Sequence, residues 1–71
     1  MSNTINLKFG RRIKDLRGKH GMTQEQLAEL TKTSYKYIQR IEGKTPPDVR
    51  LTTIEKLAKA LRTNLAGLLK F

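Results

Sequence analysis

A short basic segment, YKYIQRIE, carries the side chains that are best suited to bind another molecule. If the segment is helical, Ile38 and Ile41 fall on one side at about 100° per residue. Lys36, Gln39 and Arg40 share the opposite side, where amine, amide and guanidinium groups can donate hydrogen bonds. Such groups have no role in an apolar core. We therefore expect this face to be presented to a partner, with the two isoleucines anchoring the helix.

The charge of the whole chain also favours an anionic partner. Fifteen Lys and Arg against six Asp and Glu leave a net charge of +9 over 71 residues. The positive residues run from Lys8 to Lys70, so the chain is basic throughout and does not merely carry a basic tail. A polyanion such as nucleic acid is the expected partner, although a solubilising surface alone would account for a net charge of about 2 to 8.

Other classes of function find little support in the sequence. The chain has no Cys and only one His, His20, so neither a disulfide framework nor a metal site is expected. The five glycines are scattered and form no phosphate-binding loop, and we expect no enzyme activity, cofactor or small-molecule ligand. No apolar stretch approaches the about 18 residues of a transmembrane helix, and no targeting signal is visible. We therefore expect a cytoplasmic protein without a membrane span.

Helical spacing and capping residues predict an all-α fold of five short helices. The first is capped by Asn3 or Thr4 and ends at Gly21, a residue typical of helix C-terminal caps. The second follows a capping box formed by Thr23 and Gln26. The inward positions of these two helices are Phe9, Ile13, Leu16, Leu27, Ala28 and Thr31.

The remaining three helices follow from similar signals. Ser34 is a good N-cap for the third, which must cross the second steeply because the turn between them is short. Residues 43–50 contain both prolines and predict an exposed loop. Thr52 and Glu55 predict a capping box for the fourth helix, and Asn64 caps a short fifth. No internal repeat or second domain is visible. The inward positions are Ile54, Leu57, Ala58 and Leu61 in the fourth helix, and Leu65, Leu68 and Leu69 in the fifth face the core or a partner.

Several fragments of the chain occur in a recognisable order. They are Phe9, Gly10, Ile13, Leu16 and Arg17; TQEQLA from Thr23; Ser34, Ile38, Ile41, Glu42, Gly43 and Lys44; and LAKAL from Leu57. Together they resemble the five-helix, lambda-repressor-like DNA-binding domain of the Cro and phage-repressor (XRE-like) family. The resemblance covers about residues 7–69 and implies one domain over residues 1–71, with the second and third helices as a helix-turn-helix motif. It implies a sequence-specific, double-stranded DNA-binding transcriptional regulator of repressor-like type, and the sequence does not distinguish activation from repression.

The resemblance also implies roles for individual residues. The residues that would reach base edges in the major groove are Tyr35, Lys36, Gln39 and Arg40, whose donors suit guanine, adenine and phosphate acceptors. Those that would hold the sugar-phosphate backbone are Gln24, Ser34, Lys44, Thr45 and Arg50. Arg17 and Glu42 would form an ion pair that ties the first helix to the end of the third. Lys32 stands where the family usually has Gly in the turn, and a left-handed conformation there would cost about 1 to 2 kcal/mol.

The sequence leaves open whether the protein has a binding partner other than DNA. Members of the family usually bind near-palindromic operators as dimers, which implies a homodimer whose candidate surface is the C-terminal apolar set from Leu65 to Phe71. That set could equally belong to the core. An alternative function is a protein-binding module or antitoxin of the same fold, docking its partner through Leu30, Leu65, Leu68, Leu69 and Phe71. A basic amphipathic helix on a membrane surface is a third hypothesis, which the short, capped helices disfavour.

Overall fold

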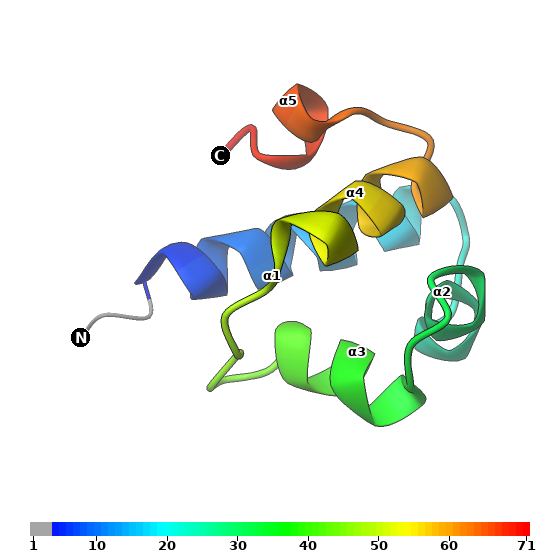
Figure 1. Cartoon of the computed structure of the whole chain (residues 1–71), viewed down its shortest axis with the longest axis horizontal. Helices are drawn as coiled ribbons and strands as arrows, with labels where there is room; N and C mark the ends of the chain where they lie inside the picture. The colour runs from blue at the N-terminus through cyan, green and yellow to red at the C-terminus, as the bar shows by residue number, and fades with distance from the viewer. Residues whose placement is uncertain (1–3) are drawn as a thin grey trace.

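Five α-helices follow one another in the computed structural model of the chain, which describes residues 4–71 (Figure 1). They are α1 (Thr4–Lys19), α2 (Gln24–Leu30), α3 (Tyr35–Ile41), α4 (Leu51–Ala60) and α5 (Leu65–Leu68). The described residues form no β-strand, so the predicted all-α fold is confirmed. Figure 1 shows α3 and α5 on opposite sides of α1, which packs against both.

Three helices begin at the side-chain caps that the sequence predicts. In the capping box of α2, the Thr23 hydroxyl accepts a hydrogen bond from the Gln26 N–H at 3.0 Å, and Gln26 Oε1 accepts one from the Thr23 N–H at 2.8 Å. Ser34 before α3 and Asn64 before α5 each accept a hydrogen bond from the backbone N–H three residues later, at 3.0 and 2.8 Å. These bonds satisfy N–H groups that have no partner inside the helix.

The starts of α1 and α4 differ from the prediction. The predicted capping box of Thr52 and Glu55 is wrong, because α4 begins at Leu51 and Arg50 is its N-cap, without a side-chain bond to the helix. Thr52 is already helical, so it lacks the extended backbone of an N-cap. In α1 the predicted cap Thr4 is the first helical residue, and Asn3 lies outside the described residues.

The core receives side chains from all five helices. The buried apolar residues are Phe9, Ile13, Leu16, Leu27, Ala28, Ile38, Ile41, Leu57, Ala58, Leu61 and Leu68, joined by the buried Thr31. Gly10 allows α1 and α3 to approach closely, because a Cβ atom there would overlap the carbonyl oxygen of Ile41 at the end of α3. This contact fixes which side of α1 faces α3.

Residues 57–68 repeat the structure of residues 27–38. The two segments have the same order of buried, half-buried and exposed side chains at every pair of positions but one. The repetition is one of structure and burial, while the sequence itself shows no repeat. The repeat escapes a search for similar residues because the two segments have the same residue at only three pairs of positions.

Both turns in this repeat close in the same way. Lys32 and Arg62 adopt left-handed backbone conformations, with φ of 55° and 56°. The next N–H in each turn, from Thr33 or Thr63, donates to the carbonyl oxygen five residues earlier at 2.9 Å. This is the Schellman arrangement, in which Gly is the usual left-handed residue. The conformation predicted for a strained Lys32 is thus present, and it occurs twice.

Candidate nucleic-acid interface

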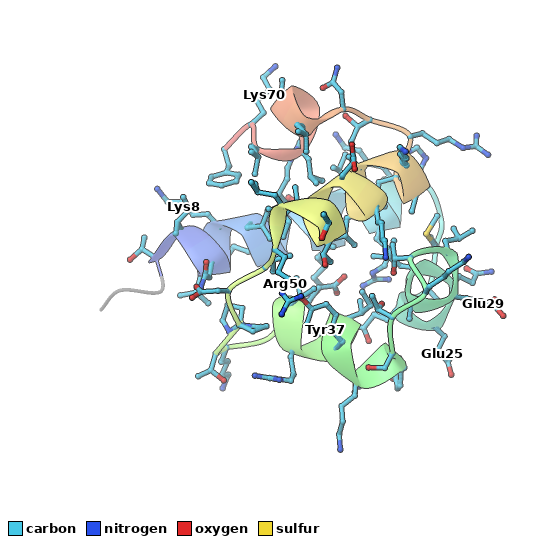
Figure 2. The ribbon with its side chains drawn as sticks, viewed as in Figure 1. Lys8, Glu25, Glu29, Tyr37, Arg50 and Lys70 are labelled. Carbon is cyan, nitrogen blue, oxygen red and sulfur yellow. The ribbon has the colours of Figure 1, made fainter. Side chains whose placement is uncertain are left out.

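The outer face of α3 presents the four side chains that the sequence assigns to base contacts. Tyr35, Lys36, Gln39 and Arg40 are all exposed, while Ile38 and Ile41 beneath them have no accessible surface. Figure 2 shows side chains of α3 extending away from the body of the protein. A helix that is fixed by two buried isoleucines can hold these polar groups at a defined depth in a groove.

The residues assigned to phosphate contacts lie around α3. Some of their side chains are exposed, and others already make hydrogen bonds within the protein. Lys44 and Thr45, in the loop after α3, and Arg50, at the start of α4, are exposed. The hydroxyl of Ser34 is already engaged as the N-cap of α3. Gln24 is half-buried, and its Nε2 donates a hydrogen bond to Glu42 Oε1 at 3.0 Å. One amide hydrogen of Gln24 is therefore used inside the protein, and the other remains for a ligand.

A network centred on Glu42 joins α1, α2 and the end of α3. Arg17 donates from Nε to Glu42 Oε2 at 2.8 Å and from Nη2 to Oε1 at 2.9 Å, and its Nη1 donates to the Met22 carbonyl oxygen at 2.7 Å. The Glu42 side chain is 2% exposed and that of Arg17 is 16% exposed. A bidentate pair this far from solvent holds the end of α3 against α1 with a defined orientation. Arg17 and Glu42, which the resemblance pairs with each other, are therefore in contact.

The same contact raises the pKa of the Arg17 guanidinium. The main cause is the hydrogen bond to Glu42, reinforced by its negative charge, and burial opposes it. A basic group with a raised folded-state pKa contributes its full stability below the unfolded-state value, and loses it only as pH rises through the folded value. Both values lie far above neutrality for arginine. Arg17 therefore adds no pH dependence to stability near pH 7.

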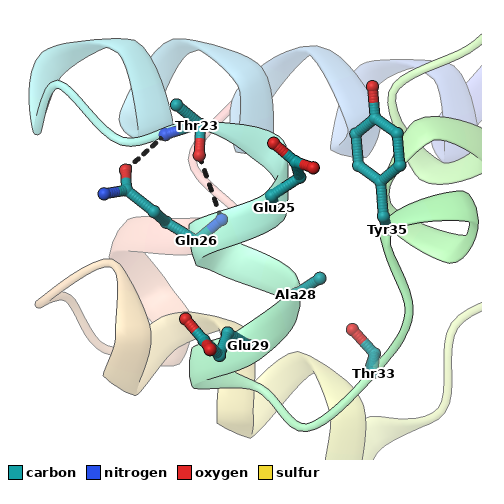
Figure 3. Close-up of a pocket in the computed structure, with 7 residues that line it drawn as sticks. All are labelled: Thr23, Glu25, Gln26, Ala28, Glu29, Thr33 and Tyr35. Carbon is teal, nitrogen blue, oxygen red and sulfur yellow. Dashed lines mark hydrogen bonds between the residues drawn. The ribbon is translucent and has the colours of Figure 1, made fainter.

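A depression between α2 and the start of α3 is acidic and contrasts with the face of α3 (Figure 3). Its volume is 440 Å³, and it is lined by Thr23, Glu25, Gln26, Ala28, Glu29, Thr33 and Tyr35. Two carboxylates without a lining Lys or Arg make this depression unfavourable for phosphate. The surface suited to a duplex is therefore α3 and the loop that follows it.

Two contacts that hold the elements around α3 and α5 were not predicted. Arg12 on α1 donates from both Nε and Nη2 to the Gly67 carbonyl oxygen, at 3.0 and 2.8 Å. Asn6 Nδ2 donates to Asp48 Oδ1 at 2.8 Å and ties the start of α1 to the loop before α4. A backbone acceptor has no residue signature, so the sequence offered no signal for the first contact.

The apolar residues assigned to partner docking divide into two groups. Leu68 is fully buried, so its assignment to a docking surface is wrong: it belongs to the core, where the inward stripe of α5 places it. Leu30, Leu65, Leu69 and Phe71 are each about half exposed. Over the part of the chain that the structure describes, no helix is long and apolar enough to cross a membrane, and no three His, Cys, Asp or Glu residues gather into a metal site.

Two short helices that cross through a Schellman turn, with a polar outer face on the second, define a helix-turn-helix protein. The helix-turn-helix family matches residues 13–68, and the chain belongs to this XRE-type family of DNA-binding transcriptional regulators. It is 40% identical to the control protein C.BamHI of Bacillus amyloliquefaciens over 72 residues, which cover 100% of this chain and 88% of that protein.

Solved structures show the same fold. The restriction-modification controller protein C.AhdI of Aeromonas hydrophila has a TM-score of 0.83 and 36% identity, over 89% of this chain and 94% of that chain. The wild-type controller protein C.Esp1396I has a TM-score of 0.79 and 30% identity, over 86% of this chain and 79% of that one. The clp gene regulator ClgR of C. glutamicum shares the fold with a TM-score of 0.86, at 23% identity over 92% of this chain and 82% of its own.

Proposed function

We propose that this chain controls the transcription of a restriction-modification system by binding a near-palindromic duplex operator as a homodimer. The observation that carries the proposal is the polar outer face of α3, supported on two fully buried isoleucines. The specific role is supported by similarity to two named controllers, C.BamHI and C.AhdI. No cofactor or catalytic step is part of the proposal.

In this proposal α3 reads base edges in the major groove. Lys36 and Arg40 donate to the O6 and N7 acceptors of guanine, and Gln39 pairs with adenine. Tyr35 lies at the first turn of α3, where it can touch a thymine methyl or donate to a phosphate. Each good base contact discriminates against a wrong base by about 1 to 3 kcal/mol.

Contacts to the backbone would set the register of α3 without reading sequence. Exposed Lys44, Thr45 and Arg50 lie in or beside the loop after α3 and offer their donors to phosphates. Gln24 offers its free amide hydrogen, held in direction by its bond to Glu42. Ser34 contributes through its backbone and through a hydroxyl that also caps α3. With six to ten phosphates neutralised per dimer, affinity should fall by about 10³ to 10⁵ between 50 and 200 mM salt.

The homodimer is supported by apolar surface around the C-terminal helix. Leu65, Leu69 and Phe71 are about half exposed, and Ile5, which lines one depression together with Leu69 and Phe71, is more exposed still. A second copy on this surface would remove the largest apolar side chains near α5 from water. A two-fold arrangement would place the two α3 helices in major grooves about 34 to 36 Å apart.

The first test is selection of binding sites from random duplexes, followed by sequencing. We expect a near-palindromic consensus with half-sites about one helical turn apart. The double variant Lys36→Ala/Arg40→Ala should then lose at least about 10² to 10⁴ in affinity for the selected site, since two base contacts are removed in each subunit. Lys56→Ala/Lys59→Ala is the matched control, because it removes the same charge from exposed positions of α4 that have no proposed contact with DNA; its affinity should stay within about threefold.

The outcome that contradicts sequence-specific binding is a selection without enrichment at low salt. Equal losses in both double variants would show that only net charge matters. Sedimentation of Leu69→Gln tests the homodimer separately: we expect weaker self-association with half-site binding retained. A protein that sediments as a monomer on a full operator would contradict the dimer alone.

A further inference from the structure

The helix α1 carries positive charge that the proposed operator contacts do not use. It holds six of the fifteen Lys and Arg residues of the chain but only one acidic residue, Asp15. One of the six, Arg17, is paired with Glu42 inside the protein. The six are Lys8, Arg11, Arg12, Lys14, Arg17 and Lys19. A recognition surface on α3 explains none of this charge.

Part of this charge lies on the side of α1 that is turned away from α3. Gly10 faces α3, because a Cβ atom there would overlap the carbonyl oxygen of Ile41. At about 100° per residue, Arg11 lies about 100° around the helix from Gly10, and Lys8 about 160°. Figure 2 shows Lys8 and Lys70 on the side of the molecule where α5 lies, opposite α3.

These cations surround one shallow depression, which we call the far patch. Its volume is 190 Å³, and it is lined by Lys8, Arg11, Arg12, Asp15, Lys70 and Phe71. Lys8, Arg11 and Lys70 are exposed, whereas Arg12 is fixed by its two hydrogen bonds to the Gly67 carbonyl oxygen. Four cationic side chains against one side-chain carboxylate make the far patch positive. Phe71 also belongs to the proposed homodimer surface, so Lys8 and Arg11 on α1 carry the proposal.

We propose that the far patch binds the phosphate backbone of a second DNA duplex, so that the protein bridges two duplex segments. Long, exposed cationic side chains around a shallow depression match a uniform phosphate backbone better than one defined acidic peptide. A duplex held by α3 also brings its own distant segments to a high local concentration. The far patch can therefore bind another segment of the same DNA molecule that α3 already holds.

The second contact is weak and depends strongly on salt. Two or three neutralised phosphates give a slope of about −2 to −3 in a plot of log affinity against log salt concentration. Sequence plays no part, because no base-reading helix lies in the far patch. Bridging is therefore largest at low ionic strength and for long or concentrated DNA.

A bridging assay with the full chain tests this proposal. A duplex bearing the selected operator is fixed to beads, saturated with protein, washed, and offered a labelled random-sequence duplex at about 50 mM salt. Wild-type protein should retain the labelled duplex. Lys8→Gln/Arg11→Gln should reduce this capture by about tenfold and lower the salt slope by about 2, with operator affinity changed by less than about threefold.

Two matched variants separate the far patch from net charge. Lys56→Gln/Lys59→Gln removes the same charge from exposed positions of α4, outside the patch, and should keep most of the capture. Asp15→Asn removes the carboxylate of the patch and should increase it. Circular dichroism melts of the variants, all at exposed positions, should match that of the wild type.

Three results would overturn the far patch. Capture that persists in Lys8→Gln/Arg11→Gln would mean that bridging runs between protein copies. Equal losses in both double variants would reduce the effect to net charge. Displacement of the labelled duplex by poly-glutamate at a lower charge concentration than unlabelled duplex needs would assign the patch to an acidic polypeptide.

The proposed operator function fails by a different result. If no operator can be selected, the variant Lys36→Ala/Arg40→Ala still reports the far patch through its residual duplex binding at low salt. Adding Lys8→Gln and Arg11→Gln to that variant should weaken the residual binding by about tenfold and lower its salt slope by about 2, while the phosphate contacts beside α3 remain. Residual binding whose affinity and salt slope do not change would contradict the far patch while saying nothing against the operator.

Discussion

The units formed by α2 with α3 and by α4 with α5 share one turn and one burial pattern, yet they present opposite surfaces. Where the first unit exposes Tyr35, Lys36, Gln39 and Arg40, the second has Leu65, Ala66, Leu69 and Lys70. The buried positions and the turn thus set the geometry, and the exposed positions set the partner. One arrangement supplies a polar face suited to DNA and an apolar face suited to a second copy of the chain.

The two units also differ in how α1 holds their second helices. The end of α3 is held by a charged pair, Arg17 with the buried carboxylate of Glu42. The end of α5 is held by Arg12, whose guanidinium donates to the neutral Gly67 carbonyl oxygen. Both contacts are bidentate at the arginine, so the comparison isolates the charge of the acceptor and its burial.

Removing the acceptor charge in the first unit should have the largest effect. Glu42→Gln leaves the Arg17 guanidinium half-buried without its counter-charge, and breaking such a pair costs about 3 to 5 kcal/mol of unfolding free energy. Arg12→Met removes a charged hydrogen bond and should cost about 1.5 to 3 kcal/mol. Urea unfolding followed by circular dichroism measures both. A larger loss for Arg12→Met would reverse the ranking of the two anchors.

The buried turn position differs in polarity between the units. Leu61 is fully buried and should lose about 2 to 5 kcal/mol on Leu61→Ala, because a cavity remains. Its counterpart Thr31 donates through Oγ1 to the Leu27 carbonyl oxygen at 2.8 Å and lies 2.9 Å from Thr33 Oγ1. Thr31→Ala should lose only about 1 to 2 kcal/mol, from one hydrogen bond and a methyl group. Equal losses in urea unfolding would show that both turns depend on burial alone.

The left-handed turn residues should respond alike in both units. Lys32→Gly and Arg62→Gly each relieve about 1 to 2 kcal/mol of backbone strain in the folded state. Glycine also raises the conformational entropy of the unfolded chain, which offsets part of this gain, so we expect a net stabilisation of about 1 kcal/mol. Gly21→Ala is the control of opposite sign, because Gly21 has φ of 62°. Thermal melts of the three variants measure these effects. Destabilisation by either glycine would mean that the lysine or arginine side chain makes a contact that outweighs the strain.

The sequence predicted the parts of this fold that depend on local signals. The caps at Thr23, Ser34 and Asn64 are each set by one side chain and its nearest N–H groups, and all three are confirmed. The predicted cap at Thr52 failed because residue type alone does not say which backbone is extended. Periodicity likewise placed the polar face of α3 outward, although its contacts with DNA remain predictions.

Apart from the Arg17–Glu42 pair, which the family resemblance implied, long-range features were beyond the reach of the sequence. The bond from Arg12 to the Gly67 carbonyl spans most of the chain, and neither residue marks it. The repeat of the two units went unseen because burial, and not residue identity, is what the units share. The far patch depends on how α5 and the C-terminal residues return to α1, which spacing within α1 cannot show.

The smallest effect concerns the position where the second unit has Gly67 and the first has Tyr37. A Cβ atom on Gly67 would overlap the Thr63 hydroxyl, the tip of a side chain that can rotate. In the first unit the corresponding hydroxyl, that of Thr33, lies within hydrogen-bond distance of Thr31, and a large side chain is accommodated. Gly67→Ala alone should therefore change stability by less than about 0.5 kcal/mol, since helix propensity offsets the crowding.

A double-mutant cycle sharpens this last comparison. In a Thr63→Ala background the crowding is gone, so Gly67→Ala should stabilise the protein by about 0.5 to 1 kcal/mol in urea unfolding. The coupling between the two positions then measures how much space the Thr63 hydroxyl takes. Additive effects in the cycle would mean that the hydroxyl does not oppose a side chain at position 67, and that Gly67 is kept for its backbone alone.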